Sequence, residues 1–305
     1  MLHHPERETP MSLDAPSTKP PIETLTQNTS MRPIAALRRG SGGPIDRLAS
    51  PSDLGELMKP FVFLDHFDLD GSDGPSLETG WHPHSGIATV TVVLEGAARY
   101  AETTGREGVV PAGAVEWMRA GGGVWHTGGA MPGRLRGFQL WVALPEHLEN
   151  TPGTSHYVMP DEVPDAGAAR VILGSHAGLE SPIDAPPMTY LAVTLSRGER
   201  WSYQPPAGHD IAWLAVSIGI LDAPAPIGPG ELAVFEQGET PIEVAAQDRT
   251  EFVIGSAPRH AHPLVLGNYS VHTSRAALQA GETEIRRIGK ELRDLGRQSY
   301  ALANL

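Results

Sequence analysis

Three histidines carry the clearest chemical signal in this sequence. His82 and His84 flank Pro83, and His126 stands at the end of a later glycine-rich stretch. Side chains two residues apart on an extended segment point the same way, because successive side chains alternate between the two faces of a strand. A third imidazole delivered by a later strand would complete a three-nitrogen site suited to iron, copper, nickel or zinc.

The residues around these histidines favour such a site. Pro83 limits the backbone between the first two histidines to extended geometry, and the glycines at 121–123 permit a tight turn before His126. The chain contains no cysteine. Any metal must therefore be held by histidine, carboxylate or water, and thiolate sites, disulfides and cysteine nucleophiles are excluded.

Short β-rich segments are the elements expected to position these residues. Glycine (34 residues) and proline (28 residues) are frequent, which favours many turns between short strands over long helices. β-branched and aromatic residues cluster between the turns. The first half of the chain predicts strands at 61–64, 87–94, 100–103, 109–110, 115–118 and 138–144.

The second half repeats this layout. Strands are expected at 171–173, 189–195, 211–220, 232–235 and 251–254. Gly-Pro-Gly at 228–230 precedes its strand as Pro-Ala-Gly at 111–113 precedes the strand at 115–118. This weak internal duplication predicts an all-β protein with two β-barrels in tandem.

The remaining segments complete the predicted organisation. Residues 1–31 lack periodicity and predict a flexible tail. We expect an N-terminal domain with the metal site at 32–150, a polar linker at 151–170 and a C-terminal domain at 171–305. Ser274 is suited to cap a helix that runs to about Leu295. The apolar stripe of this helix is expected to lie on the barrels.

Charge and hydropathy exclude several partners. A net charge of −13 over 305 residues argues against direct nucleic-acid binding, which needs clustered lysine and arginine. No apolar run reaches the roughly 18 residues of a membrane span, and residues 1–31 have no apolar signal core. We therefore expect a cytoplasmic protein, and we expect it to be a monomer.

Four stretches of the first half resemble the pirin family of bicupins. They occur in order, at Phe63 to Phe67, His82 to Thr91, Trp117 to His126 and Gly137 to Trp141. The second half matches more loosely. The resemblance implies two tandem cupin (jelly-roll) β-barrels with one iron site, in the first barrel. Some members of the family resemble quercetin 2,3-dioxygenases in activity, and others are described as transcriptional cofactors.

The resemblance assigns the metal ligands and exposes one departure. The family's three histidine ligands correspond to His82, His84 and His126, but its fourth ligand, a glutamate, corresponds to Gly128. The usual cupin carboxylate after the first histidine pair is also missing, near Ala88. Losing an anionic ligand leaves a metal more positive and opens a coordination position.

Two consequences of this loss stay open. Three imidazoles could hold a metal with water or substrate in the gap, or the affinity could fall and the site be weakly occupied. The expected ion is Fe2+, with Ni2+, Mn2+, Cu2+ and Zn2+ as alternatives.

Several neighbours could support the site. Glu116, from a nearby strand, could replace the missing carboxylate. Asp65 and His66 could orient a ligand histidine, because a metal-bound imidazole usually donates its other N–H to an acceptor. Gln139 is expected to line the barrel.

A second histidine pair lies in the C-terminal half. His260 and His262 again flank one residue, but no third, glycine-preceded histidine accompanies them. The pirin family keeps no metal in this domain. We therefore expect both to be surface or hydrogen-bonded polar residues.

The leading functional hypothesis is a metal-dependent dioxygenase of the quercetin 2,3-dioxygenase type. It would act with O2 on a flavonol-like or other enol-bearing aromatic substrate, with the metal as Lewis acid and template and an apolar wall excluding water. One alternative is a non-catalytic iron- or redox-sensing protein that regulates a protein partner. Another is a bicupin that has lost its metal and serves a structural or binding role.

Overall fold

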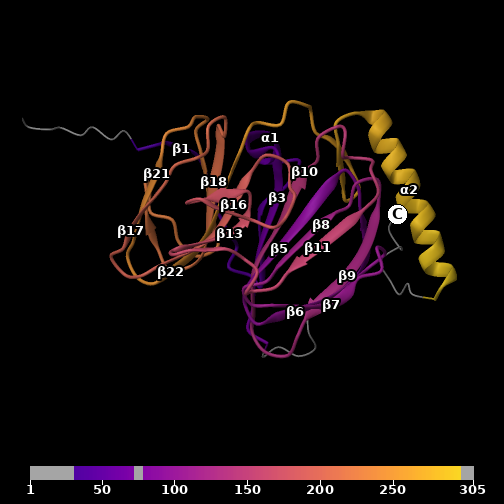
Figure 1. Cartoon of the computed structure of the whole chain (residues 1–305), viewed down its shortest axis with the longest axis horizontal. Coiled ribbons are helices and arrows are strands. Elements are labelled where there is room, and N and C mark those ends of the chain that lie inside the picture. The colour runs from indigo at the N-terminus through magenta and orange to yellow at the C-terminus, as the bar shows by residue number, and fades with distance from the viewer. Residues whose placement is uncertain (1–30, 72–77, 297–305) are drawn as a thin grey trace, which may run out of the picture. The chain divides into compact units, whose positions relative to one another are not determined.

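The computed structural model describes residues 31–71 and 78–296. Two β-barrels lie beside each other in this part of the chain, and the final helix covers the first of them (Figure 1). The prediction of an all-β protein with two barrels and a C-terminal helix is confirmed. The tail expected at 1–31 lies, apart from Met31, outside the described residues.

The first barrel consists of two facing sheets. The larger has six strands in the order β11-β8-β5-β10-β3-β2, and the smaller has four in the order β4-β9-β6-β7. Their bounds are β2 (Ile45–Ala49), β3 (Phe61–Leu69), β4 (Glu78–His84), β5 (Ile87–Glu95), β6 (Ala97–Glu102), β7 (Glu107–Pro111), β8 (Val115–Arg119), β9 (Val124–Ala130), β10 (Leu135–Ala143) and β11 (Thr154–Val158).

The second barrel repeats the arrangement. A seven-stranded sheet, β1-β20-β18-β22-β16-β13-β12, faces the three-stranded sheet β17-β21-β19. Their bounds are β1 (Ile34–Arg39), β12 (Asp165–Ala166), β13 (Ala169–Leu173), β16 (Thr189–Leu195), β17 (Arg200–Tyr203), β18 (Ile211–Ile218), β19 (Leu221–Asp222), β20 (Glu231–Phe235), β21 (Ile242–Ala246) and β22 (Thr250–Ala257).

Two hairpins and two helices complete the described elements. The hairpins pair β14 (Ser175–His176) with β15 (Leu179–Glu180) and β23 (Val265–Gly267) with β24 (Ser270–His272). Helix α1 (Gly55–Met58) is a single turn, and α2 (Arg275–Asp294) is the predicted C-terminal helix. The Ser274 side chain caps it by accepting a hydrogen bond from the Ala277 N–H at 3.2 Å.

The first strand and the last helix of the described chain each pack against the barrel that is farther away in sequence. Strand β1 pairs with β20 of the second barrel although it precedes the first barrel in sequence. Helix α2 follows the second barrel but packs on β9 of the first, where Ile285 and Leu292 contact Trp125. Residues 151–170, where we expected a linker, contain β11, which pairs with β8. The domain boundaries stay a prediction.

In each large sheet, the register aligns one residue of every strand with one residue of its neighbours. We call such a set of aligned residues a row, and matching rows of the two barrels can be compared. In the first barrel, one row across β2, β3, β10, β5, β8 and β11 reads Arg47, Asp65, Gln139, Thr91, Glu116, Tyr157. In the second, the row across β13, β16, β22, β18, β20 and β1 reads Val171, Leu191, Ile254, Leu214, Ala233, Leu37. The same position in the fold is polar in one barrel and apolar in the other.

The barrels share a hydrophobic core between their outer faces. Phe61 of β3 meets Trp213 of β18 edge to face, with ring centroids 5.5 Å apart. Arg136 of β10 reaches across the same boundary and donates to Ser217 at 2.8 Å and to Glu251 at 2.7 Å. The interface is therefore both apolar and ion-paired. Among the described helices, none has the length and apolar character needed to cross a bilayer.

Candidate metal centre

Strands β4 and β9 bring the three predicted histidines together. His82 lies directly opposite His126 in the antiparallel pair, and His84 follows on the same face of β4. One potential ligand atom from each imidazole lies within 4.8 Å of the other two. Within residues 31–71 and 78–296, no other group of three or more histidine or acidic side chains meets this spacing.

Backbone carbonyls orient two of the three rings. The Nδ1–H of His82 donates to the Gly80 carbonyl oxygen at 2.8 Å, and the Nδ1–H of His84 donates to the Tyr269 carbonyl oxygen at 3.2 Å. Each bond leaves the Nε2 lone pair for another partner. The supporting acceptors that metal-bound histidines usually need are therefore supplied by the main chain.

The surroundings keep all three imidazoles neutral. Burial lowers the pKa of His84 and of His126 well below the ordinary value, and the neighbouring imidazoles lower both further. Burial also lowers the pKa of His82, against the effect of the Gly80 carbonyl. Neutral imidazole is the form that binds metal, so at neutral pH no proton needs to be removed first.

The spacing of the nitrogens fits a shared ion. His84 Nε2 and His126 Nε2 lie 3.0 Å apart. At this distance two ring nitrogens share either a proton or a cation. Metal–imidazole bonds of about 2.0–2.1 Å place two ligand nitrogens roughly 3 Å apart. The three residues therefore fit a divalent metal that accepts imidazole ligands.

Two glycines allow the close approach of chain segments around the histidines. Gly86 has φ +72°, and a Cβ there would lie 2.0 Å from the carbonyl oxygen of Val271 in β24. Gly121 has φ +52°, and its Cβ would lie 2.1 Å from the Thr151 carbonyl oxygen. Only glycine fits at these turns, which set where β4 ends and where β9 begins.

A cavity of about 140 Å³ lies inside the first barrel beside the histidines. His82, His126 and Gly128 line it from the small sheet. Its opposite wall is formed by members of the polar row, namely Asp65, Gln139, Thr91 and Glu116. Apolar side chains, including Phe67, Leu69, Val110 and Leu135, complete the lining. The cavity is thus a largely apolar space with polar groups at two sides.

Gly128 offers little room for the glutamate found at this position in the resembling family. A Cβ at Gly128 would lie 2.9 Å from the Arg99 carbonyl oxygen. The Gly128 N–H and C=O are both engaged by the Thr79 hydroxyl, at 3.0 and 3.1 Å. A side chain at position 128 would therefore require the backbone of β6 at Arg99 to shift.

The four predicted supporting residues separate into two groups. Asp65, Gln139 and Glu116 line the cavity with the histidines. The Glu116 carboxylate lies outside the cluster of potential ligand atoms, and Asp65 is bound by Arg47 through two hydrogen bonds of 2.7 and 3.0 Å.

His66 lies on the other face of β3 from Asp65. Its Nε2 is 3.0 Å from the Ser217 hydroxyl of the second barrel, and its ring stands against Phe138. These contacts give no support to a role in orienting a metal ligand. Neighbouring residues on a strand point to opposite faces, so Asp65 and His66 cannot both face the cavity.

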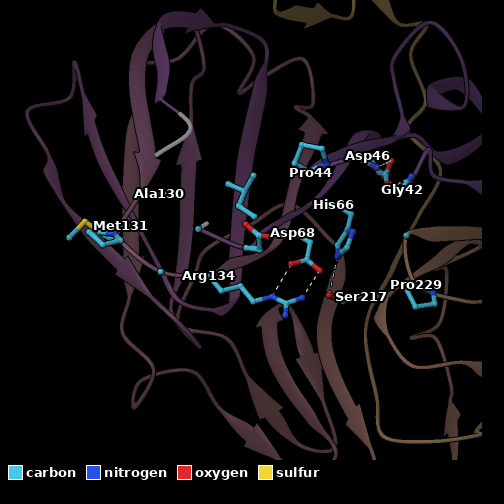
Figure 2. A pocket seen from close by; sticks show the side chains of 17 residues that line it. Gly42, Pro44, Asp46, His66, Asp68, Ala130, Met131, Arg134, Ser217 and Pro229 are labelled. Carbon is cyan, nitrogen blue, oxygen red and sulfur yellow. Dashed lines mark hydrogen bonds and ion pairs between the residues drawn. The ribbon is translucent and has the colours of Figure 1, made fainter. Parts of the chain in front are cut away.

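His66 lines a larger hollow between the barrels. This hollow has a volume of about 970 Å³ and is lined mainly by glycine, proline and acidic residues (Figure 2). Its polar groups are already engaged: Arg134 donates to Asp68 at 3.0 and 2.8 Å, and Asp46 accepts from the Ser41 hydroxyl at 2.7 Å. The larger of these two hollows is therefore not the one that the candidate metal ligands line.

Tyr269 is a site residue that the sequence reading missed. It stands at the tip of the β23–β24 hairpin with φ +61°, a conformation unusual for a residue with a Cβ. Its ring centroid lies 5.8 Å from that of His82 and 6.0 Å from that of His84. Tyr269 accepts through its backbone carbonyl and has a left-handed backbone conformation. Neither property can be recognised from residue type or spacing, so no sequence signal identifies this residue.

His260 and His262 do not form a second centre. Their ring centroids lie 5.6 Å apart, and they belong to no cluster of potential ligands among the described residues. The interpretation of this pair as ordinary polar residues agrees with these contacts.

Comparisons with known proteins agree with this architecture. The family model described as Pirin matches residues 45–142. A pirin-like protein of Caulobacter vibrioides is 38% identical over 193 residues, covering 59% of this chain and 68% of that protein. A Pseudomonas aeruginosa protein, named as a candidate quercetin 2,3-dioxygenase, is 32% identical over 264 residues, covering 80% of this chain and 87% of that protein.

Solved structures share the fold. The crystal structure of quercetin 2,3-dioxygenase from Acinetobacter baumannii superposes with a TM-score of 0.78 at 24% identity, covering 86% of this chain and 98% of that one. A bacterial pirin from Escherichia coli, solved in complex with nickel(II), gives a TM-score of 0.58 at 20% identity, covering 74% and 99%. At these identities the likeness establishes the fold alone.

Proposed function

The chain belongs to the pirin family, and from its histidine geometry we propose that it is a metal-dependent dioxygenase. The proposed metal ligands are His82, His84 and His126, with Fe2+ as the physiological ion. The proposed substrate is a flavonol-like or other enol-bearing aromatic compound, which reacts with O2. The single observation that carries the proposal is the convergence of three neutral imidazoles, two buried and that of His82 half-buried, beside an internal cavity.

The metal, when bound, would polarise a coordinated hydroxyl and hold substrate and O2 in place. The protein's own residues supply the rest. The Gly80 and Tyr269 carbonyls hold the His82 and His84 rings so that both Nε2 atoms face the site. Apolar residues such as Val110 and Leu135 limit water in the cavity. Because position 128 carries no side chain, the site keeps one more position for substrate than the family pattern would leave.

The cavity favours an enzyme over a sensor that acts only through its surface. A redox sensor needs a metal and a responsive exterior, but it needs no internal space beside the metal. Here the space is present, and its far wall carries hydrogen-bonding groups, including Gln139, Thr91 and Glu116. Such convergent polar groups in an apolar pocket are typical of small-molecule sites.

The decisive experiment combines metal analysis with oxygen consumption. Purified protein is loaded with Fe2+, and in parallel with Ni2+ or Mn2+, and oxygen uptake is followed after quercetin is added. The His126→Ala variant is treated identically, and bound metal is measured in both proteins. We expect uptake only in the metal-loaded native protein. Equal oxygen uptake in the native protein and the variant would remove the proposal.

A further inference from the structure

Glu116 is a buried carboxylate in the wall of the cavity opposite the histidines. It projects inward from β8 at the level of Thr91 and Gln139 and lines the same cavity as His82 and His126. The residue is only 5% exposed. The Thr91 hydroxyl donates a hydrogen bond to Oε2, so one side of the carboxylate is held while the rest lines the cavity.

No cation compensates this carboxylate. In the described part of the chain, no arginine or lysine forms an ion pair with Glu116, whereas Asp65 of the same row pairs with Arg47. Titratable and charged groups face it from five strands. They are Tyr157 of β11, Tyr100, Glu102 and Arg99 of β6, Asp65 of β3, His82 of β4 and His126 of β9.

This environment favours a carboxylate that can take up a proton near neutrality. Burial raises the pKa of Glu116 to about 7, and the neighbouring Glu102 raises it while the hydrogen bonds from Thr91 and Tyr157 act in the opposite direction. A group that both holds and releases a proton near the working pH is suited to general base catalysis.

The fold itself does not require a carboxylate here. The corresponding residue of the second barrel is Ala233, which lies opposite Leu214 as Glu116 lies opposite Thr91. That barrel is closed by apolar side chains alone along the matching row. Burying a carboxylate without a cation is costly, so the residue needs an explanation beyond packing.

We propose that Glu116 is the proton acceptor for the substrate hydroxyl at the three-histidine site, replacing in this role the carboxylate absent at position 128. The inference rests on the proposed function. In the step, the O–H bond of the enol breaks, its proton moves to a Glu116 carboxylate oxygen, and the electron pair stays on the substrate oxygen as an enolate. The proton is retained inside the complex and is available for return to the product.

The test follows the proton directly. Full-length protein is loaded with Zn2+, which accepts imidazole ligands without redox chemistry, and 3-hydroxyflavone is the probe. The absorbance spectrum reports whether the bound probe is ionised. Calorimetry at pH 8 in two buffers of different ionisation enthalpy reports the protons released on binding. We expect the native protein to bind an ionised probe with almost no net proton release.

The isosteric variant Glu116→Gln separates this role from others. We expect it to retain zinc and to bind the probe either un-ionised or with one proton released per probe bound. The matched control is Glu102→Gln, which removes the neighbouring buried carboxylate. It should bind an ionised probe without proton release, as the native protein does.

Each failure has its own meaning. If Glu116→Gln shows the native spectrum and the native proton balance, the role of Glu116 is overturned and the proposed function stands. Loss of probe binding in a zinc-loaded Glu116→Gln also overturns it, since Glu116 would then be a binding group. If zinc-loaded native protein does not bind the probe, the proposed function and this inference fail together.

Discussion

The matching central strands of the two barrels follow the same order with nearly the same register, yet the barrel interiors differ in polarity. In the second barrel, the inward row of Leu191, Ile254 and Leu214 belongs to a continuous apolar cluster. In the first barrel, the matching residues are Asp65, Gln139 and Thr91, and a cavity lies above them. The difference lies in side chains, because hydrogen bonding between the strands is retained in both barrels.

A binding site inside a barrel lowers the stability of that barrel. An interior filled with aliphatic side chains contributes the hydrophobic free energy that stabilises a barrel. An interior with buried histidines, a carboxylate and empty space gives up part of that free energy. The shared core around Phe61 and Trp213 joins the barrels. Packing against the second barrel therefore stabilises the first barrel, which contains the cavity.

The largest expected effect tests whether metal binding is confined to the first barrel. His126→Ala removes one of three ligands and should abolish binding at micromolar metal, because disturbing a supporting partner alone already costs about 10–100-fold in affinity. The matched control is the double variant His260→Ala/His262→Ala, which should bind metal as the native protein does. Titration calorimetry measures both. Weaker binding in the control would place a ligand in the second half.

An exchange between matching rows tests the two interiors. Ile254→Gln buries an unpartnered amide in the apolar cluster and should lower the free energy of unfolding by about 3 kcal/mol. The mirror change, Gln139→Ile, places an aliphatic group in a cavity wall and should cost less than about 1 kcal/mol. Denaturant unfolding compares them. Equal losses would mean that the barrels tolerate polarity alike.

The pH dependence of stability distinguishes Glu116 from its apolar counterpart. Because its folded pKa of about 7 exceeds the ordinary value, its protonation favours the folded state below about pH 4.5, and this contribution is lost as the pH rises through 7. Glu116→Gln should therefore match the native protein at pH 5 and exceed it at pH 8 by on the order of 2 kcal/mol in metal-free protein. Parallel stability curves across this range would contradict the assignment.

The smallest expected effect concerns the glycine at the departure from the family pattern. Gly128→Ala should lower the free energy of unfolding by about 1 kcal/mol, because its Cβ would meet the Arg99 carbonyl oxygen at 2.9 Å. The matched control is Gly43→Ala, because a Cβ at Gly43 would have no neighbour closer than 3.5 Å. Thermal unfolding of both variants is the measurement. If Gly128→Ala unfolds at the same temperature as the native protein, the backbone of β6 can move away from the added Cβ at little cost in free energy.

The sequence predicts the interior of each sheet better than its edges. Strands at 87–94 and 189–195 were expected almost as they occur, in β5 and β16, because β-branched runs between turn residues identify central strands. The edge strands β1 and β11 were missed. Their pairing with β20 and β8 depends on contacts between distant segments, which composition and periodicity do not encode.

The same limit applies to the site. Histidine type and spacing predict His82, His84 and His126 as neighbours, and Glu116 was a candidate from its strand. His66 was grouped with Asp65 by adjacency alone, although alternation along a strand separates the faces of the two residues. Tyr269 contributes through its backbone carbonyl, which every residue type possesses, so only the folded chain identifies it.

The bond from His84 to the Tyr269 carbonyl also has a consequence for biosynthesis. The acceptor follows the histidine by 185 residues, and chains begin to fold from the N-terminus while they are being made. The first barrel can close early, but His84 gains its orienting partner only after the β23–β24 hairpin has been synthesised. The site is therefore fully oriented only after residue 269 has been synthesised, so that tight metal binding depends on a segment far beyond the first barrel in sequence.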